Sequence, residues 1–284
     1  MKLTNCFTGI LGLPFAYSQG GITATLVVLV MVGWIATHTM AMLVEVRRTL
    51  KEENPRIVTY ADIGEHLFGV WGGRILNGFL IFTQLGFCCV YIVFEVENTS
   101  NLACELGWGT EVEGEVPPCQ PSVDKKVWVI PWFFVFVLLS WIRSLKGVAY
   151  VSNFSNVSIL FSIIVILTAS GIQLNYILGE DGGGLDVVTG IVPSTFAIML
   201  CSGVYAFEGI GTVLPIVTGM KKPHLFSPVL IFVMVLSTVN YVVFGLVPYL
   251  AFGSSTSDVI TENLKIFADC YPPNCDKNMT WIVL

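Results

Sequence analysis

The chain has 284 residues, of which 54% are hydrophobic and only 12% charged, and its formal net charge is −6. Soluble domains carry about 25% charged residues. Their helices show polar faces at helical spacing, whereas the apolar runs here show no such face over about 20 residues. The composition therefore excludes a soluble globular protein and indicates an all-α polytopic membrane protein that lies in a lipid bilayer.

Apolar runs of spanning length recur along the chain. We predict seven membrane spans and the start of an eighth, at residues 3–18, 22–44, 75–94, 127–142, 150–178, 191–217, 226–252 and from 280 onward. The first span is short and contains Gly9, Gly12 and Pro14, and the sixth contains Gly203, Gly209 and Gly211. Because glycine and proline weaken helices, we predict that both of these spans are discontinuous.

The basic residues predict the orientation in the membrane. If the N-terminus is cytoplasmic, four lysines fall in outer loops: Lys125, Lys126, Lys265 and Lys277. Ten basic residues then fall on the inner side: Lys2, Arg47, Arg48, Lys51, Arg56, Arg74, Arg143, Lys146, Lys221 and Lys222. Because cytoplasmic loops carry an excess of Lys and Arg, we predict a cytoplasmic N-terminus.

The outer loops of this topology face an oxidising space, either extracellular or lumenal. Disulfides persist in such spaces, and four cysteines in these loops are disulfide candidates: Cys104, Cys119, Cys270 and Cys275. Four cysteines allow three pairings, between which the sequence does not choose. Asn98 and Asn278 begin sequons on the same side and are predicted glycosylation sites.

Glu208 lies inside the sixth apolar run, directly before Gly209. A carboxylate at bilayer depth is costly unless it is paired, protonated or wetted. Irregular backbone at that depth survives only where it faces protein or a water-filled cavity. The first and sixth spans cross the membrane in opposite directions, as the discontinuous helices of inverted-repeat transporters do. Since half-helix ends favour both a carboxylate and an ammonium, the pattern predicts a binding site for a small zwitterion.

Two motifs resemble a known family. Residues 5–14, NCFTGILGLP, are similar to the N-x-G-T-G-L-L-G-L-P signature in the first span of the amino acid/auxin permease family. Residues 203–215, GVYAFEGIGTVLP, resemble the sixth span of its proton-coupled amino acid transporter branch and of the related vacuolar transporters. The likeness covers nearly the whole chain. It implies an inverted-repeat fold of the APC and leucine-transporter type, and a secondary active carrier of small neutral amino acids with symported protons.

The resemblance also implies a set of site residues. The first-span break would meet the substrate carboxylate with Thr8, Gly9 and Ile10. The sixth-span break would lie near the ammonium and consists of Phe207, Glu208 and Gly209. Two aromatic residues of the third span, Tyr91 and Phe94, would line the pocket. Glu208 and His38 are the candidates for proton coupling. Three roles stay open for Glu208: partner of the substrate ammonium, proton carrier, or a structural hydrogen bond between the half-helices.

The length of the chain departs from the family pattern. An inverted repeat needs two sets of five spans, so the single transmembrane domain at 1–284 would hold a first repeat at 1–178 and part of a second at 191–284. We therefore expect an incomplete fold, truncated at both ends. The alternative to a carrier is a non-transporting interaction or nutrient-sensing protein with an unidentified membrane partner, or an inactive truncated isoform.

Other classes of function have little support in the sequence. No metal-ligand cluster, nucleophile elbow or phosphate loop is evident, so we predict no enzyme activity, metal, cofactor or nucleic-acid partner. The outer cysteines suit a plasma membrane or a lysosomal or late endosomal membrane. The exact substrate stays open.

Overall fold

The computed structural model describes residues 9–53, 59–103, 109–111, 119–121, 124–141, 145–179, 187–220, 222–261 and 263. The chain forms two units. One combines Met1–Thr59 with Ser152–Leu284, and the other is Tyr60–Val151. Both interrupted spans predicted from the sequence therefore belong to the first unit, and the third predicted span belongs to the second.

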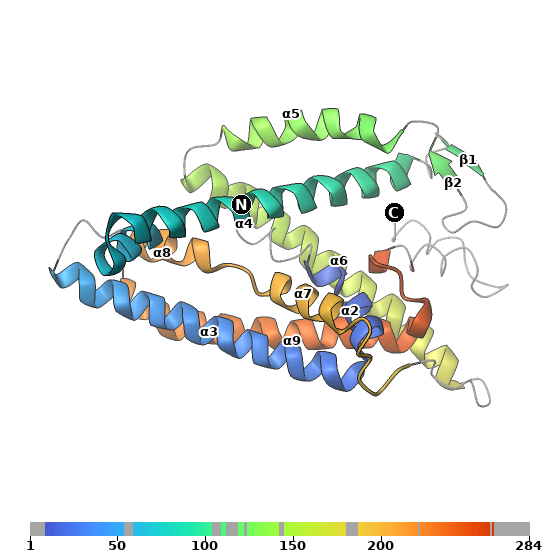
Figure 1. Cartoon of the computed structure of the whole chain (residues 1–284). Helices are drawn as coiled ribbons and strands as arrows, with labels where there is room; N and C mark the ends of the chain where they lie inside the picture. The colour runs from blue at the N-terminus through green and yellow to red at the C-terminus, as the bar shows by residue number, and fades with distance from the viewer. Residues whose placement is uncertain are drawn as a thin grey trace. The chain divides into compact units, whose positions relative to one another are not determined.

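Helices dominate the described structure (Figure 1). The α-helices are α2 (Leu13–Gly20), α3 (Ile22–Glu53), α4 (Tyr60–Ala103), α5 (Val129–Ser140), α6 (Leu145–Gly179), α7 (Phe196–Ala206), α8 (Ile210–Gly219) and α9 (Phe226–Phe252). Short 3₁₀ helices are η2 (Lys125–Trp128), η3 (Pro223–Leu225) and η4 (Gly253–Ser255). Two strands, β1 (Gly109–Glu111) and β2 (Cys119–Pro121), pair antiparallel.

Five helical stretches of the described residues are long and apolar enough to cross a membrane: Ile22–Lys51, Tyr60–Ser100, Asn153–Asn175, Phe196–Gly219 and Pro223–Ser255. They coincide with the second, third, fifth, sixth and seventh predicted spans. A shorter apolar helix, Lys126–Ser140, covers the fourth, and residues from 280 onward lie outside the described part. The helical polytopic class is confirmed, whereas the inverted repeat, its boundaries and the number of spans stay predictions.

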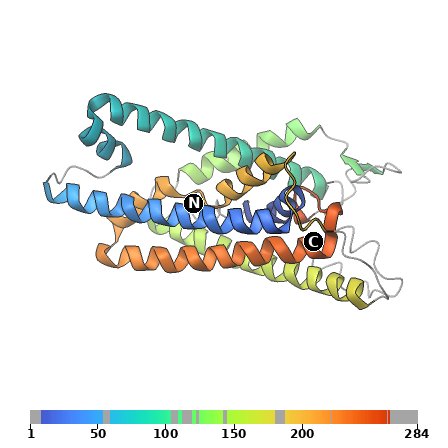
Figure 2. The same cartoon turned by 60° about the horizontal axis from the view of Figure 1, so that its bottom comes forward.

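The short helix α2 lies at the centre of the first unit. It packs on α3, α7 and α9 (Figures 1 and 2), and its residues Leu13, Ala16 and Tyr17 are fully buried. The Tyr17 ring stacks on Tyr249 of α9 with ring centroids 6.2 Å apart. Gly245 of α9 makes this contact possible, because a Cβ atom there would lie 2.5 Å from Cε2 of Tyr17. The C-terminal part of the first predicted span is thus a core element.

The loop at 187–195 holds the joint between α2 and α3. The Ile22 N–H donates a hydrogen bond to the Val188 carbonyl at 3.0 Å. At the joint, Gly21 ends α2 with a φ of 78°, and a Cβ atom on it would lie 1.7 Å from the Gly190 carbonyl oxygen. The chain can therefore turn here and accept the loop only because residue 21 has no side chain.

In the second unit, α4 contains a sharp reversal at Gly69, where φ is 73° and ψ is −175°. This conformation is essentially restricted to glycine, so residue 69 separates a short N-terminal helix from the long apolar one. The Trp132 indole N–H of α5 donates to the Thr99 hydroxyl of α4 at 2.8 Å. The β1–β2 ribbon was not predicted, because strands of three residues leave no readable alternation in the sequence.

Candidate functional site

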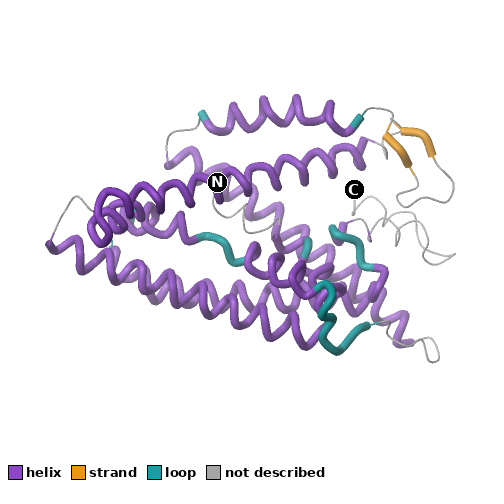
Figure 3. The backbone as a smooth tube through the Cα atoms, in the orientation of Figure 1, coloured by secondary structure: helices purple, strands orange, loops and turns teal. Residues whose placement is uncertain are grey.

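The sixth predicted span is interrupted between α7, which ends at Ala206, and α8, which begins at Ile210 (Figure 3). Residues 207–209 are non-helical, and the sequence predicts the interruption at this place. Inside it, the Glu208 N–H donates to the Tyr205 carbonyl at 3.3 Å. This bond to the third residue back is typical of the last, tightened turn of a helix. We call residues 207–209 the α7–α8 break.

The α7–α8 break brings together backbone groups of opposite polarity. The carbonyl end of α7 and the N–H end of α8 each carry a partial charge of about half an elementary charge, negative and positive respectively. Gly209 is the residue before α8 and has no side chain to cap its first turn. Glu208 is half-buried beside it. The break therefore offers a donor end, an acceptor end and a carboxyl group within three residues.

The interruption of the first span lies elsewhere than predicted. Gly9 and Ile10 are helical, so the prediction of unwound backbone at these two residues is wrong, and Thr8 lies outside the described residues. The helical path is instead interrupted by a turn at Gly12, directly before α2. Pro14 explains this position, because it has no N–H to donate to the Ile10 carbonyl and is favoured in the first turn of a helix.

The two interrupted segments touch at Gly9. A Cβ atom on Gly9 would lie 3.2 Å from Cα of Ala206 and 3.2 Å from Cδ1 of Tyr205, the last residues of α7. Ile10, Ala206 and Phe207 are buried and belong to one apolar cluster. The structure thus brings Gly9 and Ile10 against α7 immediately before the break.

Three residues that the sequence analysis did not single out also surround the break: Gly33 and Met40 of α3, and Tyr241 of α9. The Phe207 and Tyr241 rings pack edge to face with centroids 5.1 Å apart. A Cβ atom on Gly33 would come within 3.0 Å of Cζ of Phe207, and a Cβ atom on Gly209 would lie 3.6 Å from Cε of Met40. A tyrosine within an apolar run is the one sequence signal that could have pointed to this set.

One other predicted site residue of the first unit, His38, is not brought to the break. His38 is exposed on α3 and stacks on Trp34 with ring centroids 5.9 Å apart. Met40, two residues further on, is buried, so His38 lies on the opposite face of α3 from the break. Tyr91 and Phe94 are half-buried on α4, in the other unit. Their role in lining a pocket stays a prediction.

The predicted modification sites are described only in part. Asn98 lies inside α4, and its side-chain amide donates to the Phe94 carbonyl at 2.8 Å. The backbone of Cys119 belongs to β2. Four predicted sites lie outside the described residues: Cys104, Cys270, Cys275 and Asn278. Disulfides and glycosylation therefore stay predictions. Among the described residues, the free thiols are those of Cys88, Cys89 and Cys201.

Comparison with known proteins identifies several relatives. Amino acid transporter AVT3C of Arabidopsis thaliana is 32% identical over 270 residues, which cover 90% of this chain and 59% of the relative. Vacuolar amino acid transporter 4 of Saccharomyces cerevisiae is 27% identical over 258 residues, which cover 90% of this chain and 34% of the relative. The chain thus spans about a third to three fifths of the length of these relatives. No solved structure matches it significantly.

A family model supports the same assignment. The model described as transmembrane amino acid transporter protein matches residues 4–271, a range that includes both interruptions. The match confirms the resemblance carried by the two glycine-rich motifs. The chain therefore belongs to the transmembrane amino acid transporter family, whose members are carriers and not enzymes.

Proposed function

We propose that the protein moves small neutral amino acids across a membrane by secondary active transport coupled to protons. The observation that carries the proposal is the α7–α8 break, at which a helix carbonyl end, a helix N–H end and the Glu208 carboxyl group lie within three residues. A zwitterion fits both helix ends, since its ammonium is attracted to carbonyls and its carboxylate to N–H groups. Family membership supports an amino acid as that zwitterion.

The packing around the break favours a substrate with a small side chain. Gly9 approaches Ala206 closely, and the Phe207 and Tyr241 rings fill the adjoining space. We assign the substrate contacts to the first-span segment at 8–10 and the α7–α8 break. Glycine, alanine and proline are the substrates that these contacts fit best.

The relatives also favour a location. The yeast relative is named a vacuolar transporter, and a vacuole or lysosome provides an acidic lumen from which protons can drive export. We therefore place the protein in a lysosomal, late endosomal or vacuolar membrane in preference to the plasma membrane. The distribution of Lys and Arg supports a cytoplasmic N-terminus.

Reconstitution of the full-length protein into liposomes tests this function. With a pH gradient imposed, radiolabelled alanine is expected to accumulate above its equilibrium level, and a protonophore is expected to abolish the accumulation. Accumulation that is independent of the pH gradient would contradict proton coupling. Saturable alanine binding without any flux would contradict transport and favour the nutrient-sensing alternative.

Gly9→Ala is expected to lower alanine uptake by about tenfold, equivalent to about 1.4 kcal/mol. The new methyl group would lie 3.2 Å from the Ala206 backbone, tighter than ordinary contact, and would push the two segments apart beside the break. Gly12→Ala is the matched control, because its methyl group would meet the Asp258 carbonyl oxygen at an ordinary 3.7 Å. Initial uptake rates at equal protein content measure the effect. Equal rates in both variants would show that the Gly9 contact does not matter for transport.

A further inference from the structure

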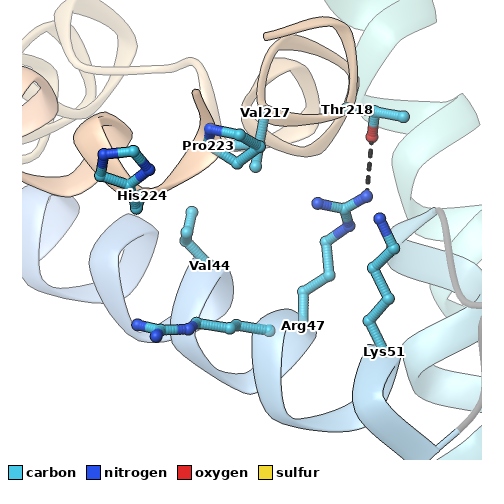
Figure 4. Close-up of a pocket in the computed structure, with 8 residues that line it drawn as sticks. Val44, Arg47, Lys51, Val217, Thr218, Pro223 and His224 are labelled. Atoms are coloured by element: carbon cyan, nitrogen blue, oxygen red, sulfur yellow. Dashed lines mark hydrogen bonds between the residues drawn. The ribbon is translucent and has the colours of Figure 1, made fainter. Parts of the chain in front are cut away.

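A second feature of the first unit is a basic pocket of about 420 Å³ between the C-terminal end of α3, the C-terminal end of α8, and η3 (Figure 4). Its charged lining comes from Arg47, Arg48 and Lys51 of α3, and His224 of η3 lies at its other side. No acidic residue of the described chain lines it. The pocket therefore concentrates positive charge without a matching carboxylate, and it is separate from the α7–α8 break at the opposite end of α8.

The spacing on α3 places the cations together. Arg47 and Lys51 are four residues apart and share one face of the helix, and Figure 4 shows both side chains extending toward Thr218. Like charges at this spacing repel each other. A bound anion would therefore reduce the repulsion among the cations at residues 47, 48 and 51.

Arg47 supplies the decisive observation. Its side chain is only 5% exposed, and one guanidinium nitrogen donates to the Thr218 hydroxyl at 3.0 Å. Within the described part of the chain, the buried Nε of Arg47 has no hydrogen-bond partner. A buried guanidinium normally has a counter-charge. The C-terminal end of α8 provides only about half a negative elementary charge, which is too little to balance the three cations of α3.

We propose that this pocket binds a phosphate group. Guanidinium groups bind phosphate oxygens through paired hydrogen bonds, and Lys51 adds a point charge. The distribution of basic residues predicts that the pocket lies on the cytoplasmic side, where basic pockets between membrane helices accept anionic lipid head groups. The phosphate can come from such a lipid or from solution. The inference does not depend on which solute the protein carries.

Ligand-induced stabilisation of the full-length protein tests the site. The protein is placed in phosphatidylcholine nanodiscs and its thermal unfolding midpoint is followed against three probes: dioctanoyl phosphatidylinositol bisphosphate, inorganic phosphate and dioctanoyl phosphatidylcholine. The variant is R48Q with K51Q, both exposed residues, because replacing the buried Arg47 endangers the fold. K222Q is the matched control, since Lys222 is exposed and lies outside the pocket.

The expected result is a saturable rise in the midpoint for wild type and K222Q, with an apparent affinity about tenfold weaker in the double variant. A rise with the phosphoinositide alone identifies a lipid head group as the ligand, and a rise with inorganic phosphate as well identifies a phosphate from solution. A rise with neither phosphate probe would overturn the proposal. So would equal affinities in wild type and the double variant, or an equal loss in K222Q, which would indicate general surface charge.

Discussion

Replacing Glu208 with glutamine is expected to reduce proton-driven alanine uptake at least about a hundredfold, equivalent to about 2.7 kcal/mol. Glutamine keeps the size of the side chain and can still form hydrogen bonds, but it neither carries a negative charge nor titrates. Glu208 lies half-buried in the α7–α8 break. An ionisable side chain inside a membrane-spanning segment is energetically costly and usually marks a functional site. Uptake into proteoliposomes under a fixed pH gradient measures the loss.

The same variant separates the three roles that are open for Glu208. Loss of pH dependence with retained alanine exchange is expected of a proton carrier, because exchange needs no net proton movement. Loss of exchange and of binding together is expected of a partner for the substrate ammonium. Wild-type uptake in E208Q would contradict both the proton-carrier role and the ammonium-partner role, and would leave a structural hydrogen bond as the remaining role of Glu208. E45Q is the control, since Glu45 is an exposed acid on α3. The E45Q protein should transport alanine at the wild-type rate.

Hydropathy predicts the long helices well because each one requires only a local property of the sequence, a continuous apolar run. Helices α3 and α9 are apolar over more than the thickness of a bilayer, so their positions can be read directly from the chain. The α7–α8 break is predictable for a similar reason. Glycines on both sides of an acid in an apolar run are a local conflict with a continuous helix, and the structure places the interruption at residues 207–209.

The first span shows where such reasoning fails. Glycine is used both to unwind a helix and to let two backbones approach, and the sequence pattern is the same for both. At Gly9 the structure uses it for close approach to Ala206, while the chain remains helical there. The interruption lies at Gly12 instead, two residues before Pro14, because this proline removes a specific backbone donor. A local pattern therefore located the segment but not the residue at which it turns.

Contacts between distant parts of the chain could not be predicted. Arg47 and Thr218 are 171 residues apart, and in the sequence Arg47 indicates only the cytoplasmic side of the membrane. Its burial results from the packing of α3 on α8, which no local pattern encodes. The same holds for Tyr241, whose position beside Phe207 depends on the packing of α9 in the first unit.

Gly21→Ala is expected to destabilise the first unit strongly. Residue 21 has a φ of 78°, which costs a residue with a side chain about 1–3 kcal/mol. A methyl group would also lie 1.7 Å from the Gly190 carbonyl oxygen, so the loop at 187–195 would have to move. That movement breaks hydrogen bonds such as Ile22 N–H to the Val188 carbonyl, each worth about 0.5–1.5 kcal/mol. We expect a total loss above about 3 kcal/mol, measured by thermal unfolding in detergent and by the yield of monodisperse protein.

Gly171→Ala makes this prediction specific to the α2–α3 joint. Gly171 lies inside α6 and nothing lies within 4 Å of the position that a Cβ atom would take. The same chemical change there should leave stability unchanged or raise it slightly, because alanine favours the helix over glycine by about 1 kcal/mol. Since α2 packs on α3, α7 and α9, loosening its C-terminal joint should unfold the first unit as a whole. Equal melting temperatures for the two variants would mean that the loop does not hold the joint in solution.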